Sequence, residues 1–168
     1  MKQNIILLFT SLLIFVSCTS EPAVDRSKVS PVIGDLSARL GKGLLSPEAQ
    51  TEADRVRTHL AFAEYVLRRN TNSDMSAEIL ARRAQVLDLL HEYWQAGTFP
   101  GHYDYADERR PCFVDQKGNV CAVGYLVEQT AGRATTDAIN AKFQYADIDV
   151  MHGEALEEWI AGSGFSKG

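Results

Sequence analysis

Two long amphipathic stretches, separated by a short polar segment, constrain the fold of this chain most strongly. The first begins at Ser46-Pro47-Glu48, which combines an N-cap residue, a proline in the first turn and an acid that the helix dipole favours. Its apolar residues recur at helical spacing, at Ala49, Ala53, Val56, Leu60, Ala63 and Leu67. Glu64 and Arg68 lie four residues apart and predict an ion pair on the outer face of this helix.

The second stretch predicts a helix from Met75 to Ala96, with Gly97 as its C-cap. Its expected inward residues are Leu80, Ala84, Leu87, Leu90 and Trp94. The polar segment Asn70-Thr71-Asn72-Ser73 separates the two helices. A loop this short joins neighbouring helices that run in opposite directions, so the sequence predicts an antiparallel helical hairpin.

Shorter elements follow the hairpin. Pro111–Val114 predicts a short strand, and Asp115–Gly118 predicts a turn with glycine where a positive φ is required. Residues 119–123 are compatible with either a strand or a helix, and we favour a helix from Val123 that ends at Gly132. Two more short helices are expected over Thr136–Phe143 and Gly153–Ala161. The predicted fold class is therefore mainly α, or α+β at most.

The N-terminus predicts export. Lys2 precedes an apolar run, Ile5–Val16, that is too short to span a bilayer and has the length of a signal-peptide core. The sequence Val16-Ser17-Cys18 that ends the run resembles a lipobox, in which a small residue precedes a cysteine that is acylated before cleavage. Phe15 replaces the leucine that is usual in a lipobox. The alternative is an ordinary secretory signal followed by an incidental cysteine.

These features divide the chain into three parts. Residues 1–17 form the signal peptide, residues 18–30 form a flexible tether, and residues 31–168 form one globular domain of ordinary size. Ser30-Pro31 predicts the start of a short helix at the beginning of that domain. Two or more acyl chains, such as palmitate, on Cys18 would anchor the protein stably to a cell membrane or outer membrane, facing the periplasm or the cell exterior.

The charge pattern excludes one class of partner. The chain carries a formal net charge of −5 and contains no basic run. Nucleic-acid binding requires clustered lysine and arginine, so no nucleic-acid partner is expected. The same pattern gives no attraction to anionic lipid, so an acyl group has to provide membrane attachment.

The two remaining cysteines lie on either side of the predicted turn. Lipidation of Cys18 leaves Cys112 and Cys121, and exported proteins sit in an oxidising compartment. Facing residues of a hairpin lie within disulfide distance, so the sequence predicts a Cys112–Cys121 disulfide. The alternative is a reactive Cys121, because the N-terminus of a helix lowers the pKa of a thiol.

Two weaker patterns suggest enzymatic chemistry. Gly118–Cys121 before an apolar helix loosely resembles the nucleophile segment of papain-like or transglutaminase-like enzymes, with His152 as the possible base. This pattern predicts a cysteine-dependent hydrolase or acyltransferase. A polar loop contains His102, Asp104, Asp107 and Glu108. It suggests a metal-dependent hydrolase at His102 and Asp104, with a solvated loop as the simpler interpretation.

The C-terminal half also carries a wider resemblance. Its motifs are Arg110–Asp115, Gly118, Cys121–Leu126, Trp159-Ile160 and Ser163–Phe165. Together they resemble a group of uncharacterised secreted bacterial proteins and lipoproteins. The resemblance implies no activity, but it implies that Cys112, Cys121 and the turn between them form a structural centre.

No complete catalytic set is present in the sequence, and neither a metal site nor a cofactor is assigned. The first hypothesis is therefore a membrane-anchored, non-enzymatic module that binds an envelope partner or a small molecule, or supports the envelope structurally. The cysteine-dependent enzyme at Cys121 and His152 and the metal-dependent hydrolase remain the alternatives.

Overall fold

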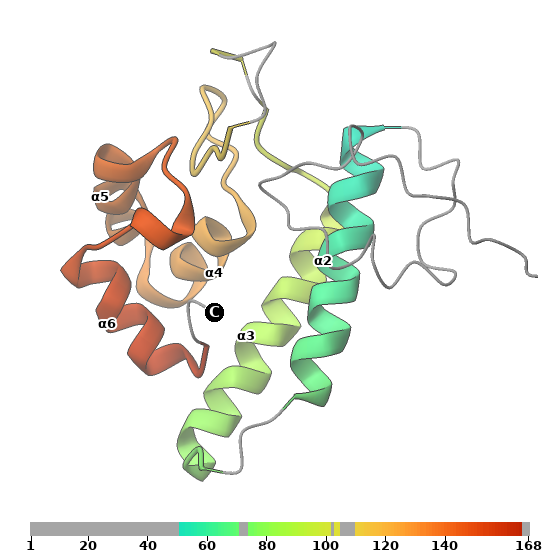
Figure 1. Cartoon of the computed structure of the whole chain (residues 1–168), viewed down its shortest axis with the longest axis vertical. Coiled ribbons are helices and arrows are strands. Elements are labelled where there is room, and N and C mark those ends of the chain that lie inside the picture. Colours follow the sequence, from blue (N-terminus) through green and yellow to red (C-terminus); the bar gives the residue numbers. More distant parts are fainter. Residues whose placement is uncertain (1–50, 71–73, 102, 105–109, 166–168) are drawn as a thin grey trace, which may run out of the picture.

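A helical hairpin forms one side of the molecule. The structure, a computed structural model, describes residues 51–70, 74–101, 103–104 and 110–165. Helix α2 spans Glu52–Arg69, helix α3 spans Ala77–Ala96, and the two lie side by side (Figure 1). The side chains of Thr51 and Ser76 cap their N-termini, and Gly97 ends α3 with a φ of 69°. The predicted antiparallel hairpin is confirmed, whereas its expected start at Ser46-Pro47 and the helix at Ser30-Pro31 lie outside the described residues.

The rest of the described chain packs beside α3 (Figure 1). It forms α4 (Ala122–Ala131), α5 (Arg133–Phe143), the short 3-10 helix η3 (Ile148–Val150) and α6 (Glu154–Ser163). The three short helices predicted from the sequence are confirmed, and the structure decides between strand and helix at residues 119–123. Cys121 is the N-cap and α4 begins at Ala122, while η3 was not predicted.

The segment before α4 is a tight turn. Its only antiparallel bridge within the described residues joins Val114 to Val120. The N–H of Asp115 donates to the carbonyl of Asn119 at 2.9 Å, and Gly118 takes a φ of 83° in the turn itself. The predicted turn is therefore present, but the predicted strand at 111–114 is reduced to one bridge.

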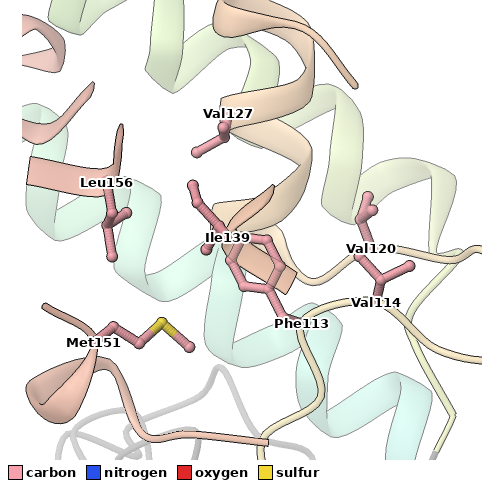
Figure 2. Close-up of a cluster of buried hydrophobic side chains, with 7 residues drawn as sticks. All are labelled: Phe113, Val114, Val120, Val127, Ile139, Met151 and Leu156. Atoms are coloured by element: carbon pink, nitrogen blue, oxygen red, sulfur yellow. The ribbon is translucent and has the colours of Figure 1, made fainter. Parts of the chain in front are cut away.

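Two hydrophobic clusters meet at α4. The first contains Phe113, Val114, Val120, Val127, Ile139, Met151 and Leu156. Figure 2 shows the Phe113 ring beside Ile139, with Leu156 and Met151 on one side and Val114 and Val120 on the other. The second cluster contains Val86, Leu87, Leu90 and Leu126. Adjacent residues of α4, Leu126 and Val127, thus join the hairpin to the C-terminal helices, and each buried side chain of this size contributes about 1.5–3 kcal/mol.

The inward face of α3 differs in part from the prediction. Leu87 and Leu90 are buried as expected, but Leu80 and Ala84 are exposed. Because α3 packs against α2, α4 and α6, its buried surface is wider than one apolar stripe and includes Val86 and Tyr93. At the end of α3 near Leu80, the buried position belongs to Arg83.

Candidate functional site

Cys121 occupies the N-cap of α4. Its backbone N–H donates to the carbonyl of Phe113 at 2.9 Å, and its sulfur accepts from the N–H of Gly124 at 3.4 Å. Burial raises the pKa of the Cys121 thiol from an ordinary value of 9.0 to about 11, despite these backbone donors. At neutral pH the side chain is therefore a protonated capping group rather than a thiolate.

The predicted disulfide is not formed, since Cys112 and Cys121 are both free thiols. The cause is the register of the turn. Val114 pairs with Val120, so residue 113 faces residue 121 and residue 112 faces residue 122. Neighbouring side chains of an extended segment point to opposite faces, so this register places Cys112 and Cys121 on opposite faces. The prediction required a register shifted by one residue, in which the two cysteines would face each other.

His152 is not paired with Cys121. The imidazole of His152 is 74% exposed, and its Nδ1 lies 3.8 Å from Oε1 of Glu157. No hydrogen bond joins His152 to Cys121, although both residues belong to the described part of the chain. The nucleophile and base of the predicted cysteine enzyme therefore do not form the direct pair that the hypothesis requires.

Asp104 is the described member of the polar loop cluster, because His102, Asp107 and Glu108 lie outside the described residues. Its two carboxylate oxygens accept hydrogen bonds from the side chains of Gln116 and Tyr145. Within residues 51–70, 74–101, 103–104 and 110–165, no three His, Cys, Asp or Glu side chains gather as a metal-binding group.

Asp115 holds the turn that precedes Cys121. Its carboxylate is buried and accepts from the N–H groups of Gly101, Lys117 and Asn119 at 2.8–2.9 Å, and from the Asn119 side chain at 3.0 Å. Burial alone would raise the pKa of Asp115, but these hydrogen bonds lower it below its ordinary value. One carboxylate thus fixes the turn and ties it to the segment that follows α3.

A buried carboxylate, Glu64, lies between α2 and α3. The residue is only 7% exposed and accepts hydrogen bonds from Trp94 Nε1 at 2.6 Å, Arg68 Nε at 2.7 Å and His91 Nδ1 at 3.0 Å. Burial alone would raise the pKa of Glu64, but hydrogen bonds from these three side chains lower it below its ordinary value. The predicted Glu64–Arg68 ion pair is confirmed, but its placement on the outside of the helix is wrong.

The hydrogen bonds of His91 assign its tautomer. Nδ1 faces the Glu64 carboxylate, which can only accept, so Nδ1 carries the proton. Nε2 then accepts from the side-chain amide of Gln95 at 2.8 Å. A carboxylate that orients a histidine is also found in catalytic and metal sites. Here both ring nitrogens are occupied by neighbouring side chains.

The sequence contained a signal for this cluster. Glu64 lies four residues after Leu60 and three before Leu67, which places it inside the apolar face of α2. His91 lies three residues before Trp94 on α3. An acid inside an apolar face requires hydrogen-bond donors, and Trp94 and His91 supply them.

Comparisons with known proteins add no relative. No protein-family model, no curated protein and no solved structure matches the chain. Among the described residues, no helix combines the length and the hydropathy needed to cross a bilayer.

Proposed function

We propose that this protein is a lipid-anchored module of the bacterial cell envelope that acts by binding rather than by catalysis. One observation carries the proposal: Cys18 follows Ser17 directly at the end of the apolar run Ile5–Val16. A run of that length is typical of a signal peptide, and a cysteine at its end is the position at which bacterial lipoproteins are acylated. Two acyl chains or more would hold the mature protein at a membrane.

The state of Cys121 supports binding over catalysis. Thiol chemistry requires the thiolate, and the pKa of about 11 leaves Cys121 protonated at neutral pH. His152, the expected base, lies on the surface beside Glu157. Within the described residues, no hydrogen bond joins these two side chains, as a cysteine-dependent hydrolase would require.

The polar residues that are buried also support a scaffold role. Asp115 uses its carboxylate to hold the turn, and Glu64 uses its carboxylate to hold α2 against α3. Each of these groups is satisfied by the protein itself. A rigid domain with such internal contacts suits a module that presents a fixed surface to a partner.

Membrane fractionation tests the anchor. The full-length chain should be expressed in a bacterial host and compared with Cys18→Ala and with the matched control Cys112→Ala. We expect the wild type and Cys112→Ala in the membrane fraction. Cys18→Ala should be released into the soluble fraction or accumulate as unprocessed precursor, because it lacks the acylation site.

One result would contradict the lipid anchor. If Cys18→Ala is processed and fractionates like the wild type, the anchor is not an acyl group on Cys18. The envelope assignment would then lose the observation that carries it.

A further inference from the structure

We propose that Arg83 couples the C-terminal ends of α2 and α6, so that the two helix ends open together. Arg83 lies in the second turn of α3 and is only 6% exposed. Its Nη1 donates to the carbonyl of Gly164 at 2.6 Å. Its Nη2 donates to the carbonyls of Leu67 at 2.9 Å and Asn70 at 3.3 Å.

These acceptors belong to two different helix ends. Leu67 lies in the last turn of α2 and Asn70 is its C-cap, whereas Gly164 is the C-cap of α6. The C-terminus of a helix carries about half a negative charge on carbonyl groups that have no partner within the helix. The guanidinium of Arg83 therefore serves as one shared cation for two helix dipoles.

In the described part of the chain, every hydrogen-bond acceptor of Arg83 is a backbone carbonyl. The Phe165 ring completes the environment, with its centroid 4.9 Å from the guanidinium carbon. Burial lowers the pKa of Arg83, which indicates that the cation is partly desolvated.

This desolvation makes the contacts interdependent. If the end of α6 moves away, Arg83 loses the Gly164 carbonyl and the Phe165 ring together. A buried cation that has lost acceptors is unfavourable, so the guanidinium turns toward water. It then also leaves the carbonyls of Leu67 and Asn70, and the last turn of α2 loses its cap.

A substitution at Gly164 would disturb the C-terminal end of α6 without changing a residue of α2. Its φ of 77° is unfavourable for other residues, and a Cβ at this position would lie 2.9 Å from the Cβ of Arg83 and 3.2 Å from the carbonyl oxygen of Ile79. Alanine at Gly164 should therefore displace the end of α6 from α3 without altering any α2 residue.

The coupling goes beyond the proposed envelope function and does not depend on the lipid anchor. α2 is the first described helix, and α6 is the last. A partner that displaces the C-terminal end of α6 would, through Arg83, loosen the C-terminal end of α2. The reverse effect follows because coupling between two sites is reciprocal.

Hydrogen exchange measured by mass spectrometry on the full chain tests the coupling. The reporter is the last turn of α2, where the N–H of Asn70 donates to the carbonyl of Val66 at 3.0 Å. Gly164→Ala should accelerate exchange there by about 5-fold or more, the lower end of usual coupling between sites. Gly132→Ala is the matched control, because Gly132 also has a positive φ of 88° at a helix C-cap but its Cβ would meet nothing within 4 Å.

Two outcomes would overturn the proposal. The first is equal α2 exchange in Gly164→Ala and Gly132→Ala. The second is an unchanged effect of Gly164→Ala in an Arg83→Met background, because the coupling would then pass through packing rather than the guanidinium. If Gly164→Ala unfolds globally, Phe165→Leu provides the same comparison, since it removes the ring over Arg83 and keeps an apolar side chain.

Discussion

Removal of the Glu64 carboxylate should weaken the attachment of α2 to α3. In Glu64→Ala, the N–H groups of Trp94, His91 and Arg68 lose their common acceptor. In Glu64→Gln, the side chain keeps its shape and one acceptor oxygen but loses the charge. The two variants therefore separate the contribution of the hydrogen bonds from that of the charge.

The expected loss of stability follows from the exposure of the three side chains that donate hydrogen bonds to Glu64. The Trp94 bond is short, at 2.6 Å, and partly buried, and a hydrogen bond to a charged group contributes about 1.5–3 kcal/mol. Arg68 and His91 are 38% and 44% exposed, so each of their bonds contributes only about 0.5 kcal/mol. We expect Glu64→Ala to lower the free energy of unfolding by about 2–4 kcal/mol, and Glu64→Gln by about 1–2 kcal/mol.

Urea denaturation followed by circular dichroism measures these differences. Glu92→Gln is the control, because Glu92 lies exposed on α3 and its substitution should change stability by less than about 0.5 kcal/mol. If Glu64→Ala behaves like Glu92→Gln, the carboxylate does not hold the helices together and the reasoning is refuted.

The Glu64 effect should depend on pH. The pKa of Glu64 is lowered in the folded protein, so its contribution is complete above the ordinary carboxyl pKa and disappears as the pH falls through the folded value. The stability difference between the wild type and Glu64→Gln should therefore be constant near neutral pH and shrink below about pH 4. A difference that persists undiminished in acid would contradict this assignment.

Three further predictions concern other parts of the domain. Native alkylation of Cys121 should be about 100-fold slower at neutral pH than that of an ordinary cysteine, because a pKa of about 11 rather than 9.0 reduces the thiolate fraction by that factor. Rapid labelling would instead favour the cysteine-enzyme hypothesis. Asp115→Ala should lower the free energy of unfolding by about 2–4 kcal/mol in chemical denaturation, because four donors lose their acceptor, and an unchanged value would mean that the turn holds without the carboxylate. Gly162→Ala should raise stability by about 0.5–1 kcal/mol in thermal unfolding, since Gly162 lies within α6 and its Cβ would meet nothing within 4 Å; a lower Tm would show that this part of α6 is not helical.

The helices could be predicted from the sequence because local signals specify them. Ser76 caps α3 and Gly97 ends it, and the spacing of Leu87 and Leu90 identifies a buried face. Such signals act within a few residues and need no knowledge of the tertiary fold. The hairpin and the three short helices followed from them.

The features that the sequence did not predict depend on the tertiary arrangement. The Cys112–Cys121 disulfide depended on the register of a turn, and a difference of one residue reverses the face on which each side chain lies. Arg83, rather than Leu80 or Ala84, lies in the buried surface of α3, because two helix ends from distant parts of the chain meet there. Neither the register nor the meeting of these ends is encoded by local periodicity.

The candidate site was predictable only in part. The sequence favoured a helix from Val123 and left residues 119–123 open, whereas the structure makes Cys121 the N-cap of α4. The burial that raises the pKa of Cys121 comes from a cluster that includes Met151 and Leu156, far along the chain. The Glu64–His91 contact joins two helices, so the spacing within α2 alone could not predict it, and Glu64 was expected on the outer face.

Intact-mass spectrometry of the protein extracted from membranes, after native alkylation without reductant, tests the central claim most directly. We expect a chain that begins at Cys18 and carries acyl groups, with Cys112 and Cys121 unlabelled until the protein is denatured and then both labelled as free thiols. An unacylated chain, or one that begins at another residue, would contradict the lipid anchor. Labelling of Cys121 in the native protein would contradict its role as a protonated capping group.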